Sequence, residues 1–329
     1  MEKKAMISIN GIRMVLLTGM ISSVMALQAQ EIADQVYWVY FKDKTGNGYT
    51  IDRPWEFLSE RSIQRRSWQG LGIDAYDLPV NGDYVEQIRQ LGAEVRHISR
   101  WLNGIAIVGA DSLLFEQVLA EPFTDTLAWE PASEEVFYPP KPGGQRFDPP
   151  LASPPDYDYG VATEQVNQLS MQFLHQLGYT GEGVWIAVLD GGFRNVDSLP
   201  SFVPLINDER LLGTRNFVND QSVFRESSAH GMYVLSTMAG EWDGNMVGTA
   251  PHASYFLATT ENTSQETRIE EIAWVEAAEL VDSLGYDVIN TSLGYSDFDG
   301  TRYDYTYEDM DGETTFISRA AAMTASRGI

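Results

Sequence analysis

The stretch Val184-Trp185-Ile186-Ala187-Val188-Leu189-Asp190-Gly191-Gly192 decides the fold of this 329-residue chain. Six apolar residues in a row, without the alternation of a half-exposed strand, predict a strand that is buried on both faces, as in the middle of a parallel sheet. The carboxylate of Asp190 then stands where the strand leaves the sheet. Because ligands bind outside the carboxyl ends of the strands in open α/β sheets, Asp190 marks the edge of a candidate active site.

The second half of the chain alternates helices and strands around this stretch. Apolar residues at helical spacing predict helices over about residues 162–177, 232–240, 265–284 and 315–325. Strands are expected over about residues 184–189, 255–258 and 287–294, and a polar segment fills the residues from 207 to 220. This alternation predicts an α/β fold with a parallel sheet and right-handed crossovers.

The first half has a different order of elements. Runs of β-favouring residues predict strands over 37–41, 93–99, 104–109 and 124–129, with Asn103-Gly104 as a turn signal. Helices are expected over about 55–68, opened by Pro54, and over 83–91 and 113–119. Apart from the extra first helix, this order predicts a small α+β domain of the ferredoxin-like kind.

A proline-rich stretch separates the two halves. Prolines and glycines crowd the residues from 137 to 159, and such a stretch holds neither a helix nor a central strand. It marks a linker that a protease can cut. The expected organisation is a signal peptide over 1–29, a first domain over 30–132, a linker over 133–160 and a second domain over 161–329.

Charge and cysteine content exclude several classes of function. The formal net charge is -25 and the pI is about 4.4, which argues against nucleic acid and anionic membrane surfaces as partners. The sequence contains no cysteine, so a thiol nucleophile, a cysteine-based metal site and a disulfide are excluded.

The N-terminus indicates export. Lys3, Lys4 and Arg13 precede an apolar run from Met14 to Ala26, and the small residue Ala29 follows at the expected cut, as in a signal peptide. A membrane anchor is the alternative, although the run is short and interrupted by polar residues. No later segment reaches the roughly 18 apolar residues of a membrane span, so we expect an extracellular or cell-surface protein without a span in its mature chain.

Asp190 and His230 are the candidates for chemistry. A histidine acts as a general base when a carboxylate holds its other ring nitrogen, fixing the tautomer and stabilising the imidazolium. From spacing alone, Asp190 could equally cap the turn after its strand, and His230 could be an ordinary residue at a helix start. The other histidines show no metal-ligand spacing, so no metal site is predicted from them.

Four segments then resemble the subtilases, the subtilisin-like serine proteases. Residues 186–192 look like the family's aspartate motif, and residues 230–240 resemble its histidine motif. Residues 248–253 match its G-x-A-P-x-A segment, and residues 287–294 are similar to the strand that lines its substrate cleft. The first domain resembles, more weakly, the family's propeptide, an intramolecular chaperone and inhibitor.

This resemblance implies an Asp-His-Ser triad that hydrolyses peptide bonds in polypeptide substrates. Asp190 would orient His230, which would act as general base and then general acid. Ser292, Leu293 and Gly294 would bind the backbone of an extended peptide, as in strand addition at a sheet edge. The protein would be made as a zymogen, inhibited by its own propeptide and matured by a cut within residues 130–159.

The third triad member is missing. None of the serines after residue 294 lies in the family's G-T-S-x-A-x-P segment, and its A-G-N segment is also absent. We expect that the sequence is truncated and that the fragment alone is inactive, because loss of the serine costs on the order of 10⁶ in turnover. The alternative is a non-catalytic pseudo-protease that binds peptides.

No cofactor is expected, and a calcium site is not identifiable from the sequence although the family often has one. The acidic insertion that follows the last strand is expected to be a solvated loop, with calcium binding as the alternative. Its carboxylates are Asp297, Asp299, Asp304, Glu308, Asp309 and Asp311.

Overall fold

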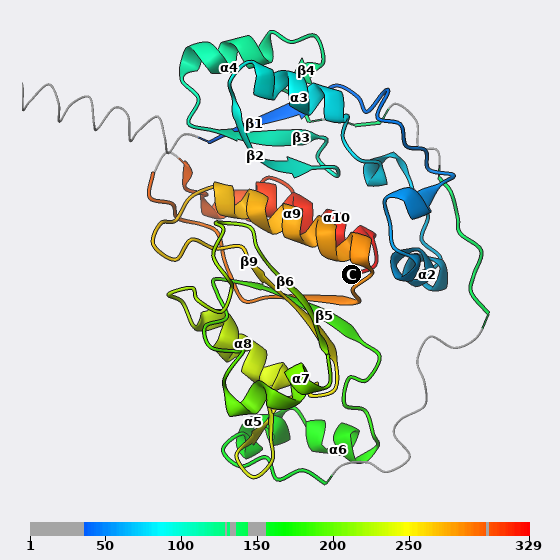
Figure 1. Cartoon of the computed structure of the whole chain (residues 1–329), viewed down its shortest axis with the longest axis vertical. Coiled ribbons are helices and arrows are strands. Elements are labelled where there is room, and N and C mark those ends of the chain that lie inside the picture. The colour runs from blue at the N-terminus through cyan, green and yellow to red at the C-terminus, as the bar shows by residue number, and fades with distance from the viewer. Residues whose placement is uncertain (1–35, 129, 132–135, 144–155, 301–302) are drawn as a thin grey trace, which may run out of the picture.

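A computed structural model describes residues 36–128, 130–131, 136–143, 156–300 and 303–329 (Figure 1). The predicted signal peptide lies outside these residues, as does much of the proline-rich linker. The described chain contains two four-stranded sheets with helices between and around them.

The first sheet is antiparallel and has the strand order β2-β3-β1-β4, as the ferredoxin-like prediction requires. Its strands are β1 (Val36–Phe41), β2 (Glu94–Ser99), β3 (Gly104–Val108) and β4 (Thr124–Asp125). Helices α3 (Gly82–Gln90) and α4 (Ser112–Leu119) pack on one face around Val39, Phe41, Ile105 and Ile107. The alternating apolar residues of β1 therefore build a small core of their own.

Two predictions in this half were wrong in detail. The single helix expected over 55–68 is a 3₁₀ turn, η1 (Pro54–Glu56), followed by α2 (Glu60–Gln69). The Ser59 side chain caps α2 by accepting a hydrogen bond from the Ser62 backbone, and this starts the helix later than expected. Strand β4 ends at Asp125 because its carboxylate accepts the next two backbone N–H groups and turns the chain.

The second sheet is parallel throughout, and its order is β10-β5-β9-β6. Its strands are β5 (Trp185–Asp190), β6 (Leu211–Asn216), β9 (Ser254–Thr259) and β10 (Val288–Thr291). Strand β5 is central and almost wholly buried, as its apolar run predicted. Strand β6 was not predicted, because it lies at an edge of the described sheet and keeps a polar, half-exposed sequence.

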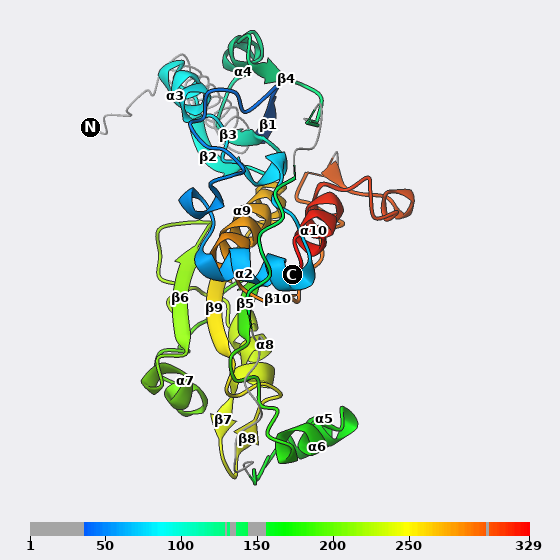
Figure 2. The ribbon, with the colours of Figure 1, turned by 90° about the vertical axis from the view of Figure 1, so that its right-hand side faces the viewer.

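Helices cover both faces of this parallel sheet (Figure 2). On one face α8 (His230–Ala239), η3 (Pro200–Phe202) and α7 (Val203–Asn207) enclose a core with Val188, Leu235 and Leu257. On the other face α9 (Ile269–Leu284) and α10 (Phe316–Ser326) pack against Ala187, Leu189 and Phe256. The parallel α/β prediction is confirmed.

The residues before β5 form two short helices where one was predicted. Helices α5 (Thr163–Gln168) and α6 (Met171–Gln176) meet at Ser170, whose φ of 58° lies in the left-handed region and breaks the helix. The remaining short elements are η2 (Ala75–Asp77), η5 (Tyr307–Asp309) and the hairpin β7 (Glu241–Trp242) with β8 (Met246–Val247).

Helix α9 lies between the two sheets and joins them. One cluster of buried residues contains Trp101 and Ala106 of the first half together with Ala273, Ala277 and much of the rest of α9. Both views show the first sheet stacked on the side of α9 that faces away from β5.

Candidate active site

Asp190 and His230 meet at the carboxyl end of β5. The carboxylate oxygen Oδ1 of Asp190 lies 2.7 Å from Nδ1 of His230, which is the first residue of α8. The Asp190 side chain is fully buried, whereas 54% of the His230 side chain is exposed. A buried carboxylate therefore holds one nitrogen of an imidazole whose ring is open to solvent.

Glycines allow the two elements to approach this closely. A Cβ atom on Gly231 would lie 2.7 Å from the carbonyl oxygen of Gly192 and 2.9 Å from Cβ of Asp190. The backbone N–H of Gly191 donates to Oδ1 of Asp190 at 2.7 Å, and Oγ of Ser228 accepts from the His230 backbone at 3.2 Å. Both partners of the pair are thus held by neighbouring residues.

Burial dominates the electrostatics of Asp190. Desolvation raises the pKa of its carboxyl group, while the hydrogen bonds from His230 and the Gly191 backbone oppose this shift. Nδ1 faces the acid, so Nε2 is the nitrogen left to exchange a proton with a reacting group.

Ser292, Leu293 and Gly294 follow β10 directly and lie beside the end of β5. Thr291 of β10 is in register with Leu189, so the three residues continue past the level of Asp190. Ser292 and Gly294 are exposed and Leu293 is half-buried. The structure brings this segment next to the Asp190–His230 pair, and its role in binding a peptide stays a prediction.

A contact that the sequence reasoning missed crosses the end of β5. The hydroxyl of Tyr295, after β10, donates to the Glu261 carboxylate, after β9. Strand β5 lies between these two strands, so the Tyr295–Glu261 contact spans the edge that carries Asp190. Tyr295 directly follows a predicted strand and Glu261 comes three residues after another, and this was the only signal in the sequence. Their pairing depends on the order of the strands in the sheet.

A polar cavity of about 580 Å³ opens at the same edge. Its walls come from the residues after β5, from the segment before α8 and from the residues after β9, which include Glu226, Ser227, Glu261 and Thr263. The segments that hold Asp190 and His230 therefore also line a space large enough for part of a ligand.

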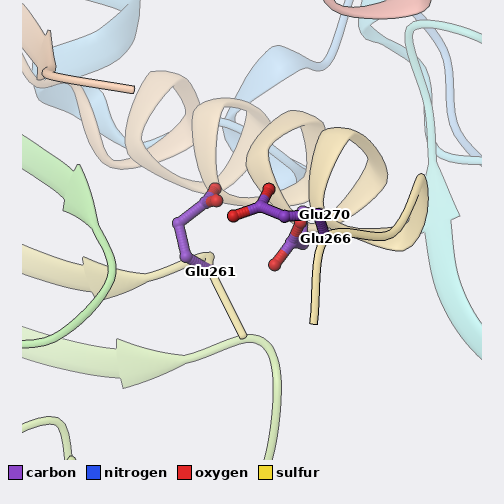
Figure 3. Close-up of side chains that lie close together, drawn as sticks. All are labelled: Glu261, Glu266 and Glu270. Atoms are coloured by element: carbon purple, nitrogen blue, oxygen red, sulfur yellow. The ribbon is translucent and has the colours of Figure 1, made fainter. Parts of the chain in front are cut away.

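Three glutamates near the end of β9 could hold a cation. Ligand oxygens of Glu261, Glu266 and Glu270 lie within 4.8 Å of one another (Figure 3). Burial is the largest cause that raises the pKa of Glu261 to about 7 and that of Glu270 to about 8, and neighbouring carboxylates add to it. Protons can therefore relieve the repulsion, and the cluster by itself does not define a metal site.

The carboxylates of the acidic insertion, for which calcium was the alternative, serve local turns. Asp304 accepts the Phe298 backbone N–H, Asp309 accepts that of Thr306, and Asp311 accepts those of Glu313 and Thr314. Whether the protein binds calcium stays a prediction.

Two protein-family models match segments of this chain. Residues 181–326 match the model of the subtilase family, and residues 36–140 match that of the peptidase S8 propeptide domain of Bacteroidota. The chain therefore carries a segment that matches a subtilase domain, preceded by a segment that matches an S8 propeptide domain.

Curated relatives are subtilisins. Subtilisin E of Bacillus subtilis (strain 168) is 30% identical over 132 residues, which are 39% of this chain and 32% of that protein. A subtilisin of Bacillus pumilus is 29% identical over 132 residues, or 39% of this chain and 44% of that protein. The chain thus spans less than half the length of these relatives.

A solved structure of MycP1 from Mycobacterium smegmatis shares 19% identity and gives a TM-score of 0.32, covering 54% of this chain and 45% of that one. In the described part of the chain, no helix has both the length and the apolar character needed to cross a membrane.

Proposed function

We propose that this protein is an exported, subtilisin-like serine endopeptidase made as a zymogen with an N-terminal propeptide. The observation that carries the proposal is the 2.7 Å contact between the buried Asp190 and the exposed His230 at the carboxyl edge of a parallel sheet. The match of the surrounding residues to the subtilase family supports it.

In the proposed mechanism His230 removes a proton from a serine hydroxyl as that serine attacks the peptide carbonyl. Asp190 keeps the imidazole in the tautomer with a proton on Nδ1 and stabilises the imidazolium that forms. His230 then gives its proton to the leaving amine. Ser292, Leu293 and Gly294 bind the peptide backbone on the exposed side of β10, next to the reacting bond.

The proposal requires a nucleophile that none of these 329 residues supplies in the family's sequence context. The experiment therefore uses the complete coding sequence, and we predict that the 329-residue chain alone hydrolyses no peptide. The lack of a serine in the family's nucleophile context also favours the second candidate, a peptide-binding protein without catalysis. Such a protein would bind extended peptides and leave them intact, even when its complete coding sequence is expressed.

Maturation of the precursor tests the role of His230. With the complete coding sequence, we expect His230→Ala to leave the precursor uncut between residues 130 and 159, because no other group can take the serine proton. The matched control is His252→Gln, since His252 contacts Glu241 and Thr180 away from Asp190. Mass spectrometry of the secreted chains reports the cut.

Normal maturation of the His230→Ala protein in a host free of other secreted proteases would contradict the assignment of His230 as the base. Loss of maturation in His252→Gln as well would show that the assay reports folding instead of catalysis.

A further inference from the structure

The three residues after β10 that are expected to bind a peptide have few contacts of their own. Ser292 and Gly294 are exposed, and a Cβ atom on Gly294 would meet nothing within 4 Å. They lie past the last residue pair of the sheet, which joins Thr291 of β10 to Leu189 of β5. Their position therefore depends on the residues on either side of them.

Side-chain hydrogen bonds hold both ends of this segment. Before it, the indole Nε1–H of Trp274 in α9 donates to Oγ1 of Thr291 at 2.9 Å. After it, the hydroxyl of the buried Tyr295 donates to the Glu261 carboxylate. Residues 292–294 thus run between two anchors, and the second anchor reaches across the end of β5 to the chain that follows β9.

The backbone keeps Glu261 close to Asp190. The N–H of Thr260 donates to the Asp190 carbonyl at 3.0 Å, so the chain after β9 stays beside the end of β5. A Cβ atom on Gly191 would lie 3.6 Å from Cβ of Glu261. Tyr295 therefore has a partner whose position is fixed by the sheet that carries the candidate active site.

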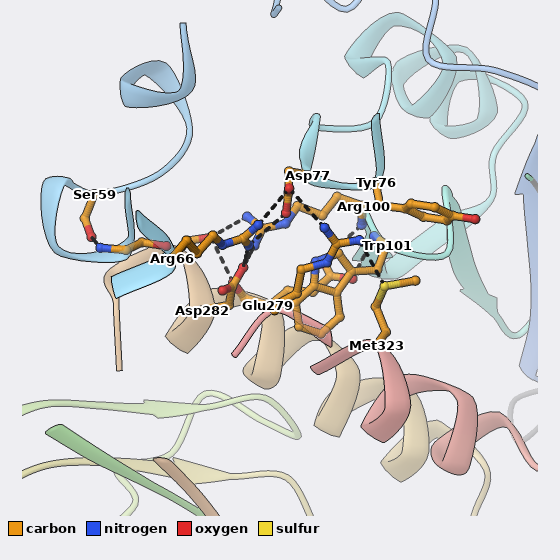
Figure 4. A network of polar contacts seen from close by, with 12 residues as sticks. Ser59, Arg66, Tyr76, Asp77, Arg100, Trp101, Glu279, Asp282 and Met323 are labelled. Atoms are coloured by element: carbon orange, nitrogen blue, oxygen red, sulfur yellow. Dashed lines mark hydrogen bonds and ion pairs between the residues drawn. The ribbon is translucent and has the colours of Figure 1, made fainter. Parts of the chain in front are cut away.

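Glu261 differs from the buried carboxylates that lie between α9 and the first half of the chain. There Asp77 and Asp282 pair with arginines (Figure 4). These arginines are Arg65, Arg66, Arg100 and Arg327. Among the described residues, no arginine, lysine or histidine pairs with Glu261. Its charge is stabilised by the Tyr295 hydroxyl and not by a cation.

The strength of the Tyr295–Glu261 hydrogen bond changes with pH. Burial raises the pKa of Glu261 to about 7, the charges of Glu266 and Asp190 add to this shift, and the bond from Tyr295 opposes it. Glu270 belongs to the same group of carboxylates. Burial, and then the Glu261 charge, raises the pKa of the Tyr295 hydroxyl, which stays a donor at neutral pH. A hydrogen bond to a charged carboxylate is stronger than one to a neutral acid.

We propose that Tyr295 and Glu261 act as positioning residues, which hold residues 292–294 beside the end of β5 and thereby set the affinity for the peptide. The inference rests on the proposed function, because it concerns the binding of the same peptide substrate. The proposal gives neither residue a contact with the reacting bond. They act on peptide binding and leave proton transfer by His230 unchanged.

Kinetics of the protein from the complete coding sequence separate binding from chemistry. We expect Tyr295→Phe to raise KM for an extended peptide by about 10-fold and to change kcat by less than about two-fold, because uniform binding energy appears in KM alone. A small fluorophosphonate places no peptide on residues 292–294. Its labelling rate should therefore stay at the wild-type value in Tyr295→Phe.

The pH dependence is a second readout, which a loss of packing alone would not change. Dividing kcat/KM for the peptide by the labelling rate removes the contribution of His230, which both share. From pH 6 to pH 8 this ratio should rise by about three-fold or more in the wild type, because ionised Glu261 binds Tyr295 more strongly. Glu261→Gln offers a neutral acceptor at every pH and should give a flat ratio. This variant keeps the test decisive if Tyr295→Phe does not fold.

The matched control is Tyr255→Phe. Tyr255 lies near the start of β9, at the amino end of the sheet, and its fully buried side chain donates to the Ala250 carbonyl at 2.9 Å. Loss of this hydroxyl should lower the melting temperature. It should leave KM and the pH dependence of the ratio as in the wild type.

An unchanged KM in Tyr295→Phe, or a wild-type ratio that stays flat from pH 6 to pH 8, would overturn the assignment of Tyr295 and Glu261 while the proposed peptidase function stands. An equal rise of KM in Tyr255→Phe would overturn it as well, because any lost buried hydroxyl would then have the same effect. A complete and folded protein that is neither labelled nor able to hydrolyse peptides would overturn the proposed function, and this assignment with it.

Discussion

Asp190 shows how one residue can serve both the fold and the site. It ends a fully apolar strand, so its carboxylate is desolvated, and its hydrogen-bond partners among the described residues are the His230 ring and the Gly191 backbone. The sequence predicted its position at the strand end, because a run of apolar residues that stops at an acid is visible without a structure. It did not show the contact, since the two residues are 40 positions apart and each had an ordinary structural explanation.

The buried glutamates make stability depend on pH. The pKa of Glu261 is about 7 and that of Glu270 about 8 in the folded protein, against 4.5 for an ordinary glutamate. Between about pH 4.5 and pH 8 the folded chain therefore holds more protons than the unfolded chain. The free energy of unfolding should fall as pH rises through this window.

Glu261→Gln should remove the part of the pH dependence of stability that comes from Glu261. We expect the variant to be more stable than the wild type at pH 8 by about 1–3 kcal/mol and to differ less at pH 5. Urea unfolding at both pH values provides the measurement, with Glu164→Gln, on the exposed surface of α5, as the control. A wild-type stability that rises between pH 5 and pH 8 would contradict this account.

At the scale of elements, the sequence predicted the strand that is buried on both faces and missed the strand that is partly exposed. Strand β5 was predicted because it is apolar throughout, whereas β6 was missed because its residues are half-exposed and polar. Helix α2 carries three arginines in ten residues, a composition typical of a solvated surface. Only the packing of α2 against α9 shows that two of these arginines are buried.

The approach of α8 to β5 depends on Gly231. We expect Gly231→Ala to push the two elements apart, because its Cβ would lie within 3 Å of Gly192 and Asp190. The cost should be about 1–3 kcal/mol in unfolding free energy. Calorimetry measures the stability, and the proton resonance of the His230 Nδ1–H reports the contact with Asp190.

The control is Gly82→Ala, because a Cβ on Gly82 in α3 would meet nothing within 4 Å. An unchanged melting temperature together with an unchanged His230 resonance in Gly231→Ala would show that this helix does not need the glycine.

At the scale of the whole molecule, the two halves share α9, which buries one side against the parallel sheet and contacts the antiparallel sheet with the other. The sequence predicted two domains and their classes from the order of elements alone. It did not predict how the halves join, since the network of Asp77, Asp282 and the arginines uses residues up to 253 positions apart. The domain limits of 30–132 and 161–329 stay predictions.

The central claim is that Asp190 and His230 activate a serine, and a fluorophosphonate probe tests it most directly because such probes label only an activated serine. We predict that the protein from the complete coding sequence is labelled covalently, and that His230→Ala lowers the labelling rate by about 10³-fold or more. His252→Gln should be labelled at the wild-type rate. Equal labelling of the wild type and His230→Ala, or no labelling of a folded and complete protein, would contradict the account.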